Sequence, residues 1–168
     1  AIATEAKRNL NADTFTALAE KGYNNAREID ACQKLNLKTI VAQQELVNSN
    51  PKGTTTEYLV NKFRYHKTSD TYTCPAGQIL RTIGTWHTKK RDDKTTYQFK
   101  KYRTPACKNC PVKHLCTGRA KGGREIERSQ YAEAVDINNR NYRRNEKLYR
   151  KRQEINEHIF GTVKRKWG

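Results

Sequence analysis

The chain has 168 residues, which is enough for one domain with a hydrophobic core, or for one domain with a small appendage. Only 35% of the residues are hydrophobic and 30% are charged, so a large core is excluded and a metal-stabilised or extended region is favoured. No run approaches the roughly 20 apolar residues that a membrane helix needs, and no signal-peptide core opens the chain. We therefore predict a cytoplasmic protein with no membrane partner.

The net charge of +17 comes from 34 Lys and Arg against 17 Asp and Glu, and it is unevenly distributed. Residues 1–61 are neutral overall, whereas residues 62–118 carry +10 and residues 119–168 carry +7. Nucleic acid is the partner that this excess favours, because Lys and Arg release the counterions condensed on a phosphate backbone. A ribosomal protein, a protein that binds anionic membranes, or simply a basic surface would show the same excess.

The first segment, residues 1–61, is predicted to form a βαβ unit. The apolar run 15–19 has the length of a buried strand, and Asn24 and Asn25 are good caps for a helix that ends at Asn36. Residues 38–42 then form a second strand. Two short strands around one helix are typical of an α/β sheet. The polar stretch that follows is predicted to be a linker.

Residues 62–128 are predicted to be rich in β-structure, and residues 129–168 to be helical. Thr-rich stretches with spaced aromatic and aliphatic residues run from Phe63 to Arg103, and turn signals stand at Ser69–Asp70 and Asp92–Asp93. Short antiparallel strands fit this pattern. From about Ser129 the chain is charged, free of proline and suited to one or two long helices. The predicted fold class is thus α/β with a β-rich insertion.

Four of the five cysteines form a candidate metal site. A Cys-x2-Cys turn allows two thiolates to bind one ion, and two further cysteines can complete a tetrahedron. Clustered cysteines in an intracellular protein favour a metal over disulfides, and four sulfur ligands favour structural Zn2+ over an iron–sulfur cluster. The alternatives are reduced thiols, a disulfide, or His114 in place of one cysteine. The predicted ligands are Cys74, Cys107, Cys110 and Cys116.

Several motifs together resemble one branch of the bacterial insertion-sequence DDE transposases. They are AEKGYNN, CPAG, the CxxCPxxxxC knuckle and YRKRQEINEHIFGTVKR, in this order from about Phe15 to Gly168. The branch carries a Cys-rich insertion before its last catalytic glutamate. The resemblance implies an RNase-H-like fold in which three acidic residues hold two divalent cations, Mg2+ or Mn2+, which activate water and then a DNA 3′-hydroxyl. It also implies self-association in a transposition complex on DNA.

The resemblance assigns site residues at both ends of the chain. Glu157 matches the last catalytic acid, on the final helix, and Glu20 matches the second acid, where the family normally has aspartate. Tyr149, Arg152 and Lys164 match the other positions of the Tyr-Arg-Glu-Lys signature and are expected to contact DNA or support the site. Four residues separate Arg152 from Glu157, where the general signature has three.

The first acid of the resemblance has no convincing match, because Asp13 precedes the strand and reads as a turn or cap residue. That acid is expected on a strand upstream of Ala1, so this chain alone is predicted not to cut or join DNA. By spacing alone, Glu157 and Lys164 would be ordinary residues of a solvated helix.

A basic ribbon interleaved with aromatic residues is predicted around Asp92–Asp93. Such a ribbon fits the phosphates of DNA or distorted transposon ends. An ordinary hairpin with a solvated charged face is the alternative. The predicted DNA-binding residues on the ribbon are Lys89, Lys90, Arg91, Lys100 and Lys101.

Two functional hypotheses follow. The first is the C-terminal part of a DDE transposase, and the second is a non-catalytic, zinc-bearing DNA-binding module in which Glu20 and Glu157 are unrelated surface residues. The first requires these two side chains to converge on one point.

Overall fold

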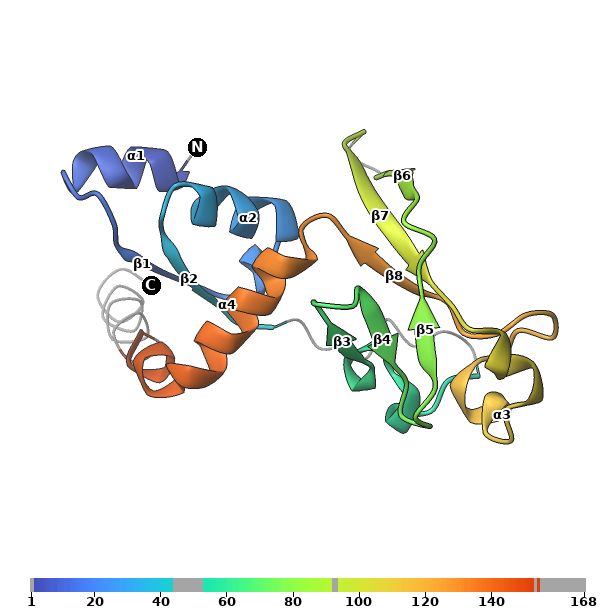
Figure 1. The fold of residues 1–168 in the computed structure, drawn as a ribbon. Coiled ribbons are helices and arrows are strands. Elements are labelled where there is room, and N and C mark those ends of the chain that lie inside the picture. Colours follow the sequence, from blue (N-terminus) through green and yellow to red (C-terminus); the bar gives the residue numbers. More distant parts are fainter. Residues whose placement is uncertain (1, 44–52, 92–93, 153, 155–168) are drawn as a thin grey trace. The chain divides into compact units, whose positions relative to one another are not determined.

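The computed structural model describes residues 2–43, 53–91, 94–152 and 154 (Figure 1). The chain divides into two compact units. Unit 1 combines both ends of the sequence, residues 1–44 and 131–168, and unit 2 is the continuous stretch 45–130. Both contain the mixture of helices and small sheets that the sequence predicts. None of the helices in the described ranges has the length and apolar character to cross a membrane.

The N-terminal half of unit 1 contains the predicted βαβ arrangement. Its two strands pair in parallel, with Leu18 opposite Ile40. The helix between them starts where expected, because the Asn25 side chain accepts a hydrogen bond from the backbone N–H of Arg27 at 3.0 Å. Asn36 follows the helix with a positive φ of 60°. The elements are α1 (Ile2–Asn9), β1 (Thr16–Ala19), a 3-10 turn (Lys21–Tyr23), α2 (Ala26–Lys34) and β2 (Lys38–Val41).

The C-terminal half of unit 1 contributes α4 (Ala132–Arg144), which packs against β2 and α2. Ala134 joins a small buried cluster with Ile29 and Val41. Asn138, which is fully buried, accepts from the N–H of Val41 and donates to its C=O, both at 2.9 Å. One amide side chain therefore satisfies both backbone groups of a strand residue. A second helical stretch, residues 146–152, follows α4.

Unit 2 contains two three-stranded antiparallel sheets, in the orders β3-β4-β5 and β6-β7-β8. A bridge between Arg81 and Arg103 connects β5 to the end of β7. The last strand, β8, was not predicted, and α4 begins three residues after the predicted start of the helical region. The strands are β3 (Arg64–His66), β4 (Thr71–Thr73), β5 (Ile79–Arg81), β6 (Trp86–Lys90), β7 (Thr96–Tyr102) and β8 (Ile126–Ser129); the short helices are Thr56–Tyr58, Val60–Lys62, Pro105–Asn109 and α3 (Lys113–Cys116).

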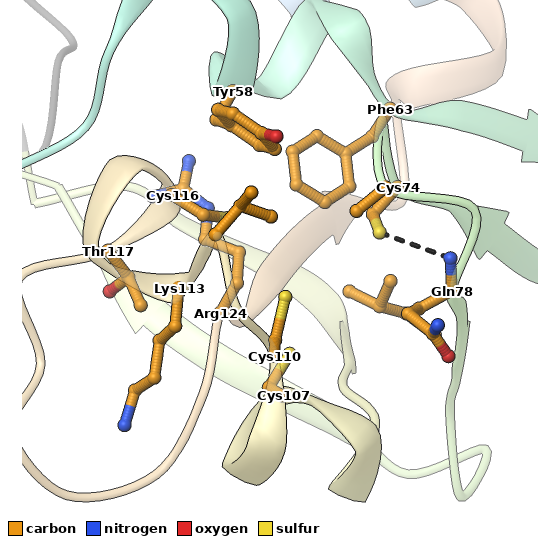
Figure 2. A pocket seen from close by; sticks show the side chains of 13 residues that line it. Tyr58, Phe63, Cys74, Gln78, Cys107, Cys110, Lys113, Cys116, Thr117 and Arg124 are labelled. Carbon is orange, nitrogen blue, oxygen red and sulfur yellow. Dashed lines mark hydrogen bonds between the residues drawn. The ribbon is translucent and has the colours of Figure 1, made fainter.

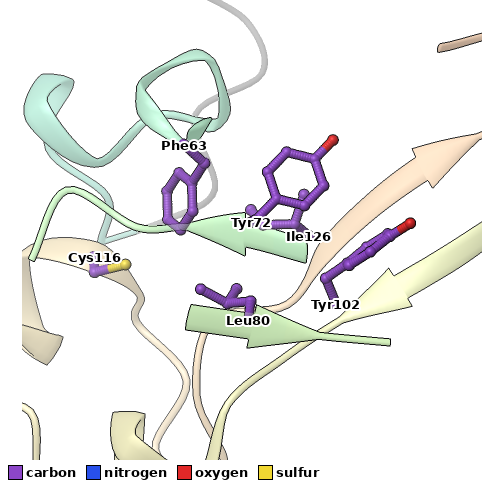
Figure 3. Packing of buried hydrophobic residues seen from close by; sticks show 6 residues of the cluster. All are labelled: Phe63, Tyr72, Leu80, Tyr102, Cys116 and Ile126. Atoms are coloured by element: carbon purple, nitrogen blue, oxygen red, sulfur yellow. The ribbon is translucent and has the colours of Figure 1, made fainter. Parts of the chain in front are cut away.

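The core of unit 2 joins the two sheets to the cysteine-rich segment (Figure 3). Residues from β4, β5, β7 and β8 meet there, and α3 contributes the thiol of Cys116. The knuckle is therefore anchored in the core of the unit. The buried members are Phe63, Tyr72, Leu80, Tyr102, Cys116 and Ile126.

Asp70 connects the two sheets of unit 2 through hydrogen bonds. It accepts from the hydroxyls of Tyr65 at 2.9 Å and Tyr102 at 2.6 Å, and from Nζ of Lys100 at 2.8 Å. Burial favours the neutral acid, but these donors outweigh it and hold the pKa of Asp70 below its usual range. Asp70, which the sequence indicated as a turn residue, therefore also holds the two sheets together.

Candidate functional site

The end of β1 meets the C-terminal helical stretch at an ion pair. Glu20 directly follows the last residue of β1, and its Oε1 lies 2.8 Å from a guanidinium nitrogen of Arg152. The Arg152 side chain is 16% exposed and that of Glu20 is 62% exposed, so the carboxylate lies at the surface and the guanidinium is mostly covered. Two segments 132 residues apart thus meet at one carboxylate.

The aromatic ring of Tyr149 packs near the guanidinium group of Arg152. Its ring is buried, lies 5.8 Å from the guanidinium carbon of Arg152, and packs edge-on against Tyr142 at a centroid distance of 4.9 Å. Burial raises the pKa of the Tyr149 hydroxyl. The guanidinium is held between an aromatic face and a carboxylate, a geometry suited to arginine.

The residues of the predicted acidic site have different outcomes. Tyr149, Arg152 and Glu20 lie together, whereas Glu157 and Lys164 fall outside the described residues. Asp13 lies in an exposed bend between α1 and β1. The convergence of Glu20 and Glu157, and the role of Glu20 as a metal ligand, stay predictions.

The four predicted cysteine ligands line one pocket in unit 2 (Figure 2). Cys74 follows β4, Cys107 and Cys110 belong to the turn at 105–110, and Cys116 ends α3. The backbone N–H of Gln78 donates to Sγ of Cys74 at 3.3 Å. The alternative ligand, His114, is exposed and is not among the residues that line this pocket.

Gly123 allows the Cys107 loop to approach closely. A Cβ atom at Gly123 would lie 2.2 Å from Cβ and 2.9 Å from Sγ of Cys107. No side chain fits at position 123 without moving the Cys107 thiol, so the close packing requires glycine there. No local sequence pattern indicates this contact, because the two residues meet only in the folded unit.

Arg124 places a buried positive charge beside the thiols. The residue is 5% exposed, its Nη1 donates to the Thr54 hydroxyl at 3.4 Å, and its Nε has no partner among the described residues. Burial raises the pKa of the Cys116 thiol, and the charge of Arg124 opposes this effect. Burial in turn lowers the pKa of Arg124. A buried guanidinium needs an anionic partner, and the thiols of the pocket are the neighbouring groups that can supply it.

The thiols do not form a ready coordination shell. Over the described ranges, no three or more His, Cys, Asp or Glu side chains are grouped so that they could hold a metal ion. Shared lining of one pocket is what the structure establishes for the four cysteines.

Strand alternation divides the predicted basic ribbon between two faces of the β6-β7-β8 sheet. Lys100 pairs in register with Trp86, and Lys90 lies on the same face, because residues two or four apart in a strand point the same way. Lys89 and Lys101 lie on the opposite face. The ribbon that the sequence suggested is therefore not a single surface.

Acidic residues neutralise much of the ribbon. Lys100 bonds to Asp70 at 2.8 Å, and its ammonium lies 5.2 Å from the ring centroid of Trp86. Lys101 pairs with Glu125 at 3.1 Å, and Lys89 with Glu127 at 3.7 Å.

Two further cations of the hairpin make different contacts. The Arg91 guanidinium lies 5.1 Å from the centroid of the Tyr97 ring. Lys90 is exposed. The acidic partners of the ribbon are Glu127 in β8, Glu125 directly before β8, and Asp70 in the β3–β4 turn. They are distant from the ribbon in the sequence, so sequence spacing did not reveal them.

The comparisons with known proteins point to one family. No curated protein and no solved structure matches the chain. The family described as "Transposase DDE domain" matches residues 73–168, more than half of the sequence, including the four cysteines of the pocket and Arg152. The chain therefore belongs to the transposase DDE domain family.

Proposed function

We propose that this chain is the C-terminal part of a DDE transposase that catalyses metal-dependent cleavage and strand transfer of DNA, with Glu20 as one of its acidic residues. Membership of the family implies DNA binding and, in general, the use of divalent metal ions. The observation that carries the proposal is the 2.8 Å ion pair between Glu20 and Arg152. Arg152 lies within the matched region and Glu20 outside it, so the contact connects the family's region to the end of β1.

The chemistry needs carboxylates near one another on rigid elements. Divalent ions held by carboxylates activate the attacking oxygen and stabilise the leaving oxygen in phosphodiester exchange. Glu20 can supply one such carboxylate, fixed by the end of β1. Arg152 holds it in place and offers donors that suit a phosphate oxygen in bidentate geometry. Glu157, five residues after Arg152, is proposed as the last catalytic acid of the site.

Metal-directed cleavage of the protein itself tests this proposal. Fe2+ with ascorbate and peroxide generates hydroxyl radicals at a bound metal and cuts the nearby backbone. We expect cuts next to residue 20 and in the stretch after Arg152, competed by Mn2+ and lost in Glu20→Gln. Glu28→Gln, an exposed acid on α2, is the matched control and should leave the pattern unchanged. Cuts that persist in Glu20→Gln would contradict the assignment.

The alternative is a non-catalytic, zinc-bearing DNA-binding module, and one observation favours it. Arg152 already neutralises Glu20, and a carboxylate paired with a guanidinium is less available to a metal. This alternative predicts DNA binding without any Glu20-dependent cleavage by Fe2+.

We propose also that Cys74, Cys107, Cys110 and Cys116 bind one structural Zn2+. The pocket that all four line supports this, together with the Gln78 N–H donated to Cys74 and the buried charge of Arg124. Four thiolates around Zn2+ carry a net charge of −2, which would give Arg124 its anionic partner. The proposal requires the four thiols to move closer together than they are in this structure when they bind the ion.

Metal content and the spectrum of the Co2+ form test the zinc site. We expect one Zn2+ per purified chain, and a Co2+ spectrum with strong thiolate charge-transfer and tetrahedral ligand-field bands. Cys110→Ser should lose them, whereas Cys32→Ser, on α2 and outside the pocket, should not. Arg124→Met should weaken Co2+ binding. A Cys110→Ser protein with full metal content would contradict the ligand set.

A further inference from the structure

We propose that DNA phosphates are bound by the basic surface of the cysteine knuckle, not by the β6–β7 hairpin that the sequence suggested. The knuckle surface is defined by Lys108, Lys113, Arg119 and Lys121. The inference rests on the proposed function, because it takes DNA as the partner and assigns it a place on unit 2.

The distribution of acidic residues singles out this surface. Residues 94–124 contain nine Lys and Arg and no Asp or Glu, so any neutralising acid must come from another part of the chain. The nearby acidic residues pair with cations in or next to β7: Asp70 pairs with Lys100, and Glu125 contacts both Lys101 and Arg103. Across the described residues, no ion pair reaches the cations of the knuckle surface.

The four cations gather around one loop, residues 117–124. Nζ of Lys113 donates to the C=O of Ala120 at 3.4 Å, which ties α3 to the loop between Arg119 and Lys121. Lys108 follows Cys107, whose Cβ packs against Gly123 at the other end of this loop. Lys113 lines the pocket, and Figure 2 shows its ammonium pointing away from the thiols of Cys107 and Cys110.

Exposure and local composition fit a phosphate partner. Lys108, Arg119 and Lys121 are exposed, and the loop between them is rich in glycine, so its backbone can approach another molecule closely. Uncompensated Lys and Arg on such a surface bind a polyanion through counterion release, independently of base sequence. The hairpin differs, because Lys89 pairs with Glu127 and its connecting loop carries Asp92 and Asp93.

Two triple variants that remove equal charge separate the surfaces. The knuckle variant is Lys108→Gln, Arg119→Gln and Lys121→Gln; the hairpin variant is Lys89→Gln, Lys90→Gln and Arg91→Gln. Binding of the zinc-loaded full chain to a fluorescent duplex of arbitrary sequence is measured by anisotropy at several KCl concentrations. Each lost phosphate contact lowers the slope of log K against log salt by about 1, so the knuckle variant should lose about 2 to 3 and the hairpin variant less than about 1.

A third variant guards against misfolding. Lys108→Arg, Arg119→Lys and Lys121→Arg keep the charge and should restore the slope. An equal or larger loss of slope in the hairpin variant would overturn the knuckle surface while leaving DNA binding intact, and so would a knuckle variant with the original slope. If the unsubstituted chain shows no salt-dependent binding, the proposed function and this surface fail together.

Discussion

Replacement of Asn138 should damage unit 1 strongly. Its amide satisfies both the N–H and the C=O of Val41 at 2.9 Å, and both residues are buried. In Asn138→Ala, no side chain replaces these partners and water has little access. Leaving a buried polar group unsatisfied costs about 1–3 kcal/mol, so the two backbone groups together should cost about 2–6 kcal/mol.

Asn141→Ala is the internal control. The Asn141 side chain donates one longer hydrogen bond, 3.2 Å to the C=O of Thr39, from a partly buried position. Its loss should cost about 1 kcal/mol. Asn138→Asp tests the direction of the bonds, because a carboxylate can still accept from the Val41 N–H but cannot donate to its C=O at neutral pH. We expect it to be nearly as damaging as alanine.

Hydrogen exchange at Val41, read by mass spectrometry on peptides that span β2, measures the effect locally. A loss of about 2–6 kcal/mol corresponds to exchange that is faster by a factor of about 30 or more, since about 1.4 kcal/mol is tenfold. The Asn141→Ala protein should show less than about tenfold. Equal acceleration in the two variants, or none in Asn138→Ala, would refute the argument that one side chain satisfies the edge of β2.

Three further outcomes are expected. Arg152→Gln should lower the free energy of unfolding in urea by about 1 kcal/mol, a value kept small because its partner Glu20 is exposed. Arg150→Gln removes an exposed ion pair and should change this free energy by less than about 0.5 kcal/mol. Gly123→Ala should reduce Co2+ affinity and Gly22→Ala, which has open space, should not. Asp70→Asn should cost about 1–2 kcal/mol at pH 7; because the folded pKa is depressed, this difference should be complete above about pH 4 and shrink as the pH falls further.

Local signals were sufficient for much of the fold. The run 15–19, the cap at Asn25 and the stop at Asn36 correctly marked β1, the start of α2 and the boundary between α2 and β2. The Thr-rich segments with turns predicted the antiparallel strands of unit 2. These features depend on residues close in sequence, which is why periodicity and capping residues reveal them.

Features that depend on distant partners were missed. β8 contains one aliphatic residue, Ile126, and becomes a strand because β7 offers it a pairing edge. The buried position of Arg124 and the pairing of Lys101 with Glu125 have no periodic signature. The contact between Arg152 and Glu20, which are 132 residues apart, was not predicted; only the resemblance assigned both residues to one site.

Unit 1 is completed by two stretches of chain that flank the whole of unit 2. During synthesis from the N-terminus, β1 and β2 emerge long before α4. The N–H and C=O of Val41 therefore lack their Asn138 partner until α4 has been made. Closing a flexible loop of this length costs about 4 kcal/mol in chain entropy. Unit 2 is continuous and faces no such delay. This interrupted connectivity favours one folding order. Unit 2 forms first, and the two halves of unit 1 then meet.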